Sequence, residues 1–143
     1  MQAKSNGGVN IADLITINPN KIVKDLIRIP DLIFHYKEAI ADLKYKQLTI
    51  DHAVKATRAR LDKEIRESAE KVTEASITRE LDRNDEIKTL VLSSASLDKE
   101  IAKTYGILDA LEKKHVTLLT LANLSQEACR QELDAIKREE SGR

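Results

Sequence analysis

The sequence is poor in the residues that break helices, stack on nucleobases or form disulfides. Its 143 residues include four glycines, two prolines, one cysteine and no tryptophan, and aromatic residues make up 3%. The lone Cys129 cannot form an intrachain disulfide, and no set of cysteines and histidines has the spacing of a metal site. With 34% charged residues, this composition is typical of long helices or a coiled coil rather than of a β-sheet protein.

An excess of one charge and long apolar runs are also absent. Lysine plus arginine and aspartate plus glutamate each number 24, so binding to a polyanion requires a local patch of charge. No apolar run approaches the roughly 20 residues that cross a bilayer, and the first residues lack a basic segment followed by an apolar one. We therefore expect no membrane partner and a reducing, cytoplasmic setting, which for a viral protein is the host cytoplasm.

Residue patterns that support catalysis are missing as well. His35, His52 and His115 are far apart in sequence, and none belongs to a His-Glu-x-x-His motif. There is no glycine-rich phosphate loop, and no serine or cysteine has a base beside it in sequence. We expect a protein that is not an enzyme and needs no cofactor or metal, with Cys129 as a buried small apolar residue.

Side chains suited to packing recur at spacings of three and four in two long stretches, which predicts two helices that each have one apolar side. The first seam consists of Ile33, Tyr36, Ile40, Leu43, Gln47, Ile50, Val54, Thr57, Leu61, Ile65, Ser68 and Val72. The second seam consists of Ile87, Leu90, Ser94, Leu97, Ile101, Thr104, Leu108, Leu111, His115, Leu118, Ala122, Ser125, Cys129, Glu132 and Ile136.

The rest of the chain is expected to form short helices and polar tails around a single helical domain at 10–138. Residues 1–9 are small and polar and are predicted to be a disordered tail, and 139–143 are expected to fray. Short helices are predicted at 10–30, where Asn18-Pro19 can start one of them. Pro30 is expected to end it, because the residue before a proline is pushed out of the α region.

The two seams lie on two predicted long helices. The first, at 31–72, is followed by a turn and a short helix at 73–84 with Thr73 as its N-cap. The second long helix occupies 85–138 and contains no proline. Long helices joined by a short connection fold back on each other. The predicted fold is therefore all-α, an antiparallel hairpin of two long helices with short helices at the N-terminus and at the turn.

A leucine-rich stretch of the second long helix cannot be covered by a two-helix hairpin alone. Its leucines point in several directions and are Leu118, Leu119, Leu121 and Leu124. We predict that they form the interface of a homo-oligomer. The alternative is that the N-terminal segments cover them within one chain.

The first long helix also has a mostly basic outer side, which we interpret as a candidate DNA-binding surface. Its cationic residues are Lys44, Lys46, Lys55, Arg58, Arg60 and Lys63. On a helical wheel Arg58 flanks the apolar seam, and Arg60 lies with Lys46 farther round the outside. The alternative is an ordinary solvated face, because Asp51 and Asp62 lie within the same stripe.

Three short motifs in these helices resemble the bacteriophage recombination mediators typified by UvsY. They are Thr57-Arg58-Ala59-Arg60-Leu61-Asp62, Tyr105-Gly106-Ile107-Leu108-Asp109 and Leu133-Asp134-Ala135-Ile136-Lys137. Related phage sequences carry a turn similar to Lys71-Val72-Thr73-Glu74-Ala75-Ser76-Ile77. The resemblance covers residues 35–138, and the first 30 residues have no counterpart in it.

The resemblance implies a helical, ring-forming oligomer that binds single-stranded DNA and helps a RecA-type recombinase displace single-strand-binding protein. By position, Arg58 and Arg60 take the DNA-contacting role in it, and the four lysines are added from the helical wheel alone. Two other functions fit the same composition. One is a structural coiled-coil assembly or scaffolding protein of a virus, with its basic face tied up in ion pairs. The other is a regulator that docks a helical face on an enzyme.

Overall fold

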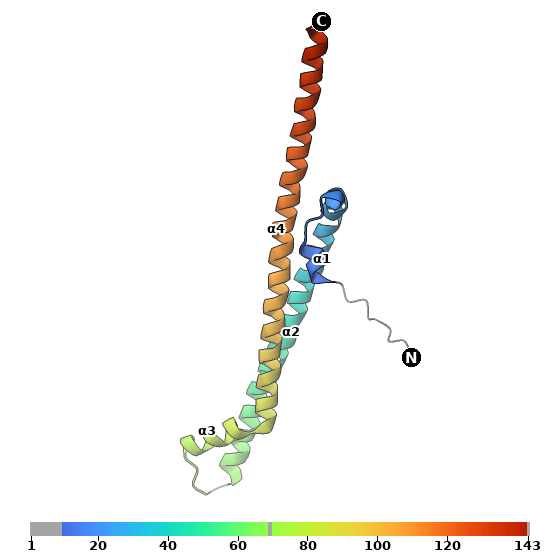
Figure 1. Ribbon diagram of the computed structural model, residues 1–143. Coiled ribbons are helices and arrows are strands. Elements are labelled where there is room, and N and C mark those ends of the chain that lie inside the picture. The colour runs from blue at the N-terminus through green and yellow to red at the C-terminus, as the bar shows by residue number, and fades with distance from the viewer. Residues whose placement is uncertain (1–9, 69, 143) are drawn as a thin grey trace, which may run out of the picture. The chain divides into compact units, whose positions relative to one another are not determined.

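The computed structural model describes residues 10–68 and 70–142, and every regular element in these ranges is a helix. The elements are α1 (Ile11–Ile15), the 3₁₀ turn η1 (Pro19–Lys21), α2 (Ile22–Ser68), α3 (Glu74–Arg83) and α4 (Asp85–Ser141), as Figure 1 shows. The predicted disordered tail at 1–9 lies outside the described residues. Glu139 and Glu140, expected to fray, belong to α4.

Pro30 does not end a helix, contrary to the expectation from sequence. It lies inside α2, which begins at Ile22 and continues to Ser68, so the long helix starts about nine residues earlier than predicted. A proline within a helix removes one backbone hydrogen bond and disturbs the turn before it. Pro30 is exposed, whereas its neighbour Ile29 is only 1% exposed. Burial of Ile29 therefore favours the helical path despite the proline.

The described residues group into two compact units. One unit contains the chain up to Tyr36 and from Gly106 onward, and we call it the terminal unit. The other contains 37–105, and we call it the turn unit. Each unit includes part of α2 and part of α4.

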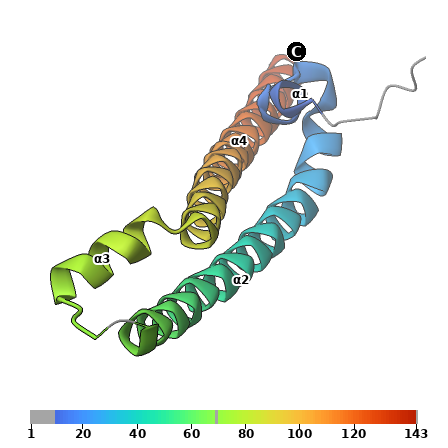
Figure 2. The same cartoon turned by 90° about the horizontal axis from the view of Figure 1, so that it is seen from below.

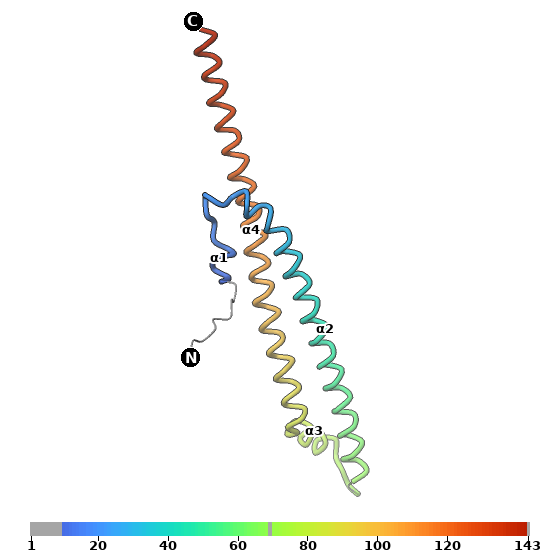
Figure 3. The backbone as a smooth tube through the Cα atoms, turned by 90° about the vertical axis from the view of Figure 1, so that its right-hand side faces the viewer, coloured from blue at the N-terminus to red at the C-terminus, as the bar shows by residue number. Residues whose placement is uncertain are grey.

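The turn unit is an antiparallel pair of helices, which confirms the all-α hairpin expected from the heptads. Contacts across the pair run in opposite directions along α2 and α4: Lys44 meets Tyr105, and Asp51 meets Ser94. The buried residues of α2 and α4 in this unit all lie on the predicted seams and are Ile40, Leu43, Thr57, Ile87, Ile101 and Thr104. Figure 3 shows the green part of α2 beside the yellow part of α4.

Helix α3 connects the two long helices within the turn unit, as Figure 2 shows. Thr73 is its N-cap, as predicted, and forms a capping box with Ser76. The Thr73 Oγ1 accepts from the Ser76 N–H, and Ser76 Oγ accepts from the Thr73 N–H, both at 3.2 Å. Ile77 is 2% exposed and anchors the short helix. The Asn84 side chain then caps α4 by accepting from the Ile87 N–H at 3.1 Å.

The terminal unit packs α1, η1 and the first turns of α2 with α4. Its buried apolar residues are Leu14, Ile29, Leu108, Leu111 and Leu118. Asn18 caps η1 with Pro19 in the first position, as the sequence predicted. From residue 123 to residue 142 every position of the chain is exposed. The predicted second seam is therefore packed only as far as Ala122, and Cys129 is exposed rather than buried.

Candidate nucleic-acid interface

Arg58 lies in the C-terminal third of α2, in the turn unit, and pairs with a carboxylate of α3. Its Nη2 lies 3.6 Å from Oδ1 of Asp82, and the two side chains are 43% and 60% exposed. Arg58 also lines a shallow groove with Ile87 and Lys88 at the start of α4. The guanidinium group of Arg58 is therefore accessible from solvent, and its ion pair with Asp82 consists of one long contact.

Arg60 is bound more tightly than Arg58, because two glutamates share its guanidinium group. Nη1 donates to Glu64 Oε1 at 3.0 Å, and Nη2 donates to Glu86 Oε2 at 2.8 Å. The hydrogen bond and charge of Glu64, followed by the charge of Glu86, raise the pKa of Arg60 above its usual value. The contact with Glu86 joins α2 to the first turn of α4.

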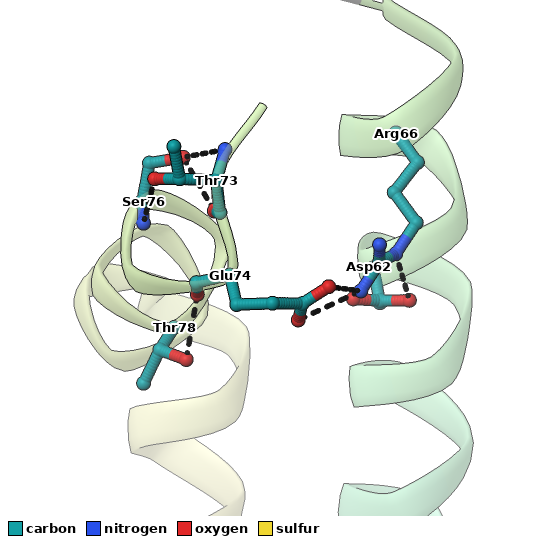
Figure 4. Close-up of polar contacts among 6 residues, drawn as sticks. All are labelled: Asp62, Arg66, Thr73, Glu74, Ser76 and Thr78. Atoms are coloured by element: carbon teal, nitrogen blue, oxygen red, sulfur yellow. Dashed lines mark hydrogen bonds and ion pairs between the residues drawn. The ribbon is translucent and has the colours of Figure 1, made fainter. Parts of the chain in front are cut away.

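The C-terminal end of α2 carries more ion pairs of the same kind. Lys63 lies 3.8 Å from Glu67, one helical turn further on. Arg66 donates to Asp62 at 3.0 Å and to both oxygens of Glu74 at 2.8 and 2.9 Å, as Figure 4 shows. These two acceptors raise the pKa of Arg66, with Asp62 contributing first. This part of the basic side is therefore an ion-paired surface.

The three remaining lysines of the candidate surface have no carboxylate partner among the described residues. Lys44 donates to the Tyr105 hydroxyl at 2.6 Å, and its Nζ lies 5.1 Å from the centre of the same ring. Lys46 and Lys55 have neither an ion pair nor a side-chain hydrogen bond in the described chain. All three side chains are exposed.

The six cations do not form one continuous patch. Lys46 lines a groove with Ser93 and Ser96 of α4. Lys55 lines a different groove, whose α4 side includes Ser94 and Asp98. Positions 46 and 55 are nine residues apart, which places them about 180° apart around a helix. A strand held by both lysines would have to pass around α2 or contact more than one subunit.

The four leucines predicted to form an oligomer interface are divided by the structure. Leu118 is 0% exposed and packs inside the terminal unit, so it is not available to another subunit. Leu118 is therefore covered within the chain, and the alternative that the N-terminal segments cover all these leucines stays a prediction. Leu121 is half-buried, whereas Leu119 and Leu124 are 44% and 61% exposed.

A second group of cations, absent from the residues predicted to bind DNA, lies at the end of η1 and the start of α2. Lys21, Lys24 and Arg28 line one pocket together with residues of α1 and the η1 cap. Their spacing of three and four residues places them on one side of the helix, and this signal is present in the sequence. This signal was missed because a helix boundary was predicted at Pro30. That boundary assigned these three residues to a separate short helix and not to the long helix with the basic side.

Metal chemistry and membrane insertion find no support in the described residues. No cluster of three or more His, Cys, Asp or Glu side chains could hold a metal ion there. In the same part of the chain, no helix has the length and apolar character needed to cross a membrane. The Nδ1 of His115 is buried without a hydrogen-bond partner among these residues, which fits a packed seam histidine.

No family model, curated protein or solved structure matches the chain. The resemblance to bacteriophage recombination mediators therefore rests on the sequence motifs alone.

Proposed function

We propose that the chain binds single-stranded DNA as a homo-oligomer and acts as a recombination mediator. In this role it helps a RecA-type recombinase replace single-strand-binding protein on the strand, as the resemblance implies. The observation that carries the DNA-binding part is the group of exposed lysines on α2, Lys44, Lys46 and Lys55, which have no carboxylate partner among the described residues.

The arginines assigned to DNA by the resemblance can join these lysines on binding. Arg58 and Arg60 are about half exposed, and so are the carboxylates that they contact. Exposed ion pairs contribute little to stability, because water and salt screen them. A phosphate presents the same kind of charged oxygen acceptor as a carboxylate, so it can replace Asp82 or Glu86 without leaving a buried charge unpaired.

Binding through these residues is expected to read the phosphate backbone and not the bases. The chain has only four aromatic residues, and Tyr105 is already engaged by Lys44. This scarcity argues against a platform for base stacking. One copy offers only a few separated cations, whereas an oligomer presents many copies to one strand and gains affinity from effective concentration. Weak contacts per subunit suit a protein that must release the strand to a recombinase.

A titration of a fluorescent oligothymidine at two salt concentrations tests this function. The wild-type protein should bind in low salt, with an affinity that falls steeply as salt increases. Lys46→Ala/Lys55→Ala and Arg58→Ala/Arg60→Ala should each bind more weakly, and the salt slope should fall by roughly 0.7 for each phosphate that the variant no longer neutralises. Lys99→Ala/Lys103→Ala removes the same charge from exposed positions of α4 and is the matched control. A wild-type protein that ignores single strands in low salt would rule the function out.

The second candidate is a structural coiled-coil assembly protein of a virus. The pairing of Arg58 with Asp82 and of Arg60 with two glutamates favours it, because a basic face tied up in ion pairs is what this function predicts. Light scattering after size-exclusion chromatography, with and without oligothymidine, separates the candidates. An oligomer that takes up DNA indicates the mediator, and an oligomer that does not indicates the assembly protein. A monomer or dimer would indicate a docking regulator instead.

A further inference from the structure

A concentration of positive charge without described partners lines one pocket of the terminal unit, away from the predicted DNA-binding residues in sequence. An open pocket of about 360 Å³ lies between α1, the η1 cap and the first two turns of α2. This space is far larger than the roughly 10–15 Å³ that one water needs, so it can take a polyatomic anion together with solvent. Three cations line it, Lys21, Lys24 and Arg28.

These three cations have no ion pair or side-chain hydrogen bond with any described residue, although two carboxylates line the same pocket. Asp25 is turned to another partner, because its Oδ2 lies 3.0 Å from the ammonium group of Lys114. Asp13 has no partner among the described residues. Among the described residues, three cations without a partner therefore line the pocket with one carboxylate without a partner, which leaves an excess of positive charge.

Neutral donors add to the anion-binding character of the pocket. Asn10 and Asn18 line it, and each uses its side-chain oxygen to cap a helical turn, by accepting from Ala12 and Asn20 respectively. With the oxygens occupied in this way, the two amide NH₂ groups are left without a described acceptor. Phosphate oxygens commonly receive hydrogen bonds from such amides in addition to lysine and arginine.

The wall formed by α1 is held in place by a buried lysine. Lys114 of α4 donates to the carbonyl oxygen of Leu14 at 2.8 Å while it pairs with Asp25, and its side chain is 4% exposed. Leu14 is itself 7% exposed. The pocket is therefore part of the packed terminal unit and not a chance gap beside a loose helix.

From this arrangement we propose that the pocket between α1 and α2 binds a phosphate group, and that in the DNA-bound protein this phosphate belongs to the strand. The second half of the statement rests on the proposed function, and the first half does not. Arg28 can bind two phosphate oxygens in a fork, while Lys21 and Lys24 neutralise its charge. Lys21, Lys24 and Arg28 thus add phosphate contacts in the terminal unit to those proposed for the cations of the turn unit.

Two measurements on the full chain test the proposal and separate it from the proposed function. In the first, inorganic pyrophosphate is titrated into ¹⁵N-labelled protein while the amide signals of residues 10–28 are followed by NMR. In the second, oligothymidine affinity is compared between wild type and Lys21→Ala/Lys24→Ala/Arg28→Ala. The matched control, Lys99→Ala/Lys103→Ala/Lys137→Ala, removes three positive charges from exposed positions of α4.

The proposal expects saturable shifts at residues 10–28 with pyrophosphate, which disappear in the pocket variant and remain in the control. It also expects the pocket variant to bind DNA at least about tenfold more weakly than the control, with a salt slope lower by about two. A charge-preserving variant, Lys21→Arg/Lys24→Arg/Arg28→Lys, should keep most of the wild-type affinity for DNA.

Each contrary result identifies which part is wrong. Pyrophosphate shifts together with equal DNA affinity in the pocket variant and the control would overturn the assignment to the strand and indicate a free phosphate-bearing anion. The absence of saturable shifts would overturn the phosphate site even if DNA binds elsewhere. If the protein binds pyrophosphate but does not bind DNA, the proposed function is wrong and the phosphate site is retained.

Discussion

The ammonium group of Lys114 lies 3.0 Å from the carboxylate of Asp25, and only 4% of the lysine side chain is exposed. The same ammonium group donates to the backbone carbonyl of Leu14 at 2.8 Å. One side chain of α4 therefore contacts both α1 and α2. Because a buried charge is tolerated only when it is paired and hydrogen-bonded, this lysine makes the packing of the terminal unit depend on three segments at once.

Replacing this lysine is predicted to cost far more stability than replacing its neighbour. Lys114→Met leaves Asp25 without its partner and Leu14 without its donor, and we expect a decrease of about 3 kcal/mol in the free energy of unfolding. Lys113→Ala is the control, because Lys113 is exposed and its one ion pair among the described residues is with Asp109 on its own helix. Urea denaturation followed by circular dichroism measures both. Equal midpoints for the two variants would contradict the role given to Lys114.

The capping box of α3 gives a second, smaller prediction. Thr73→Ala removes the hydroxyl that accepts from the Ser76 N–H, and the loss of an N-cap costs about 1 kcal/mol. Thr78→Ala in the same helix is the control, since its hydroxyl donates to the Glu74 carbonyl, an interaction that stabilises a helix little or not at all. Figure 4 shows both threonines. Urea midpoints should fall for Thr73→Ala only.

Periodicity and capping were enough to predict the all-α hairpin, because both depend on neighbours in sequence. Every buried residue of α2 and α4 in the turn unit lies on a predicted seam, and Thr73 and Asn18 cap the elements that they were expected to cap. The prediction that Pro30 ends a helix was wrong because the outcome there depends on contacts with residues distant in sequence. The local effect of the proline is to end a helix, but the burial of Ile29 in the terminal unit, a long-range effect, decides the outcome.

The candidate site could be predicted only in part, because several of its contacts join residues that are distant in sequence. The cationic side chains of α2 are exposed, as the helical wheel indicated. Their partners could not be foreseen, because Asp82 and Glu86 are distant in sequence from Arg58 and Arg60 and reach them only through the fold. The burial of Leu118 likewise depends on the packing of the terminal unit, which the heptad pattern of α4 alone does not reveal.

Removing the proline from α2 is expected to stabilise the chain. Pro30 lies in the helix interior and is exposed, so alanine there restores a backbone donor without leaving a cavity. Proline costs up to about 3 kcal/mol relative to alanine inside a helix, and we expect Pro30→Ala to recover part of this amount. The urea midpoint should rise. A fall would mean that the proline ring makes packing contacts that outweigh the missing hydrogen bond.

The exposed and buried leucines of α4 should respond to substitution in opposite ways. Leu119→Glu/Leu124→Glu places charges at exposed positions, so we expect unchanged helical content by circular dichroism and a smaller particle by light scattering if these leucines join subunits. Leu118→Ala opens a cavity at a fully buried site and should cost about 2–5 kcal/mol. An unchanged particle mass for the double glutamate variant would exclude this surface as the interface of a homo-oligomer.

Gly106 is expected to be a site where alanine is better than the natural residue. It lies inside α4 with helical backbone, and a Cβ atom added there would meet nothing within 4 Å. Alanine reduces the freedom of the unfolded chain, so Gly106→Ala should raise the free energy of unfolding by about 0.5–1 kcal/mol. Gly142→Ala is the control, because that residue follows the last turn of α4 and its added Cβ would lie 3.4 Å from the Arg138 carbonyl oxygen. If Gly106→Ala lowers stability or changes the DNA affinity while Gly142→Ala does neither, then the space beside Gly106 is used by a partner, and a second subunit is the first one to test.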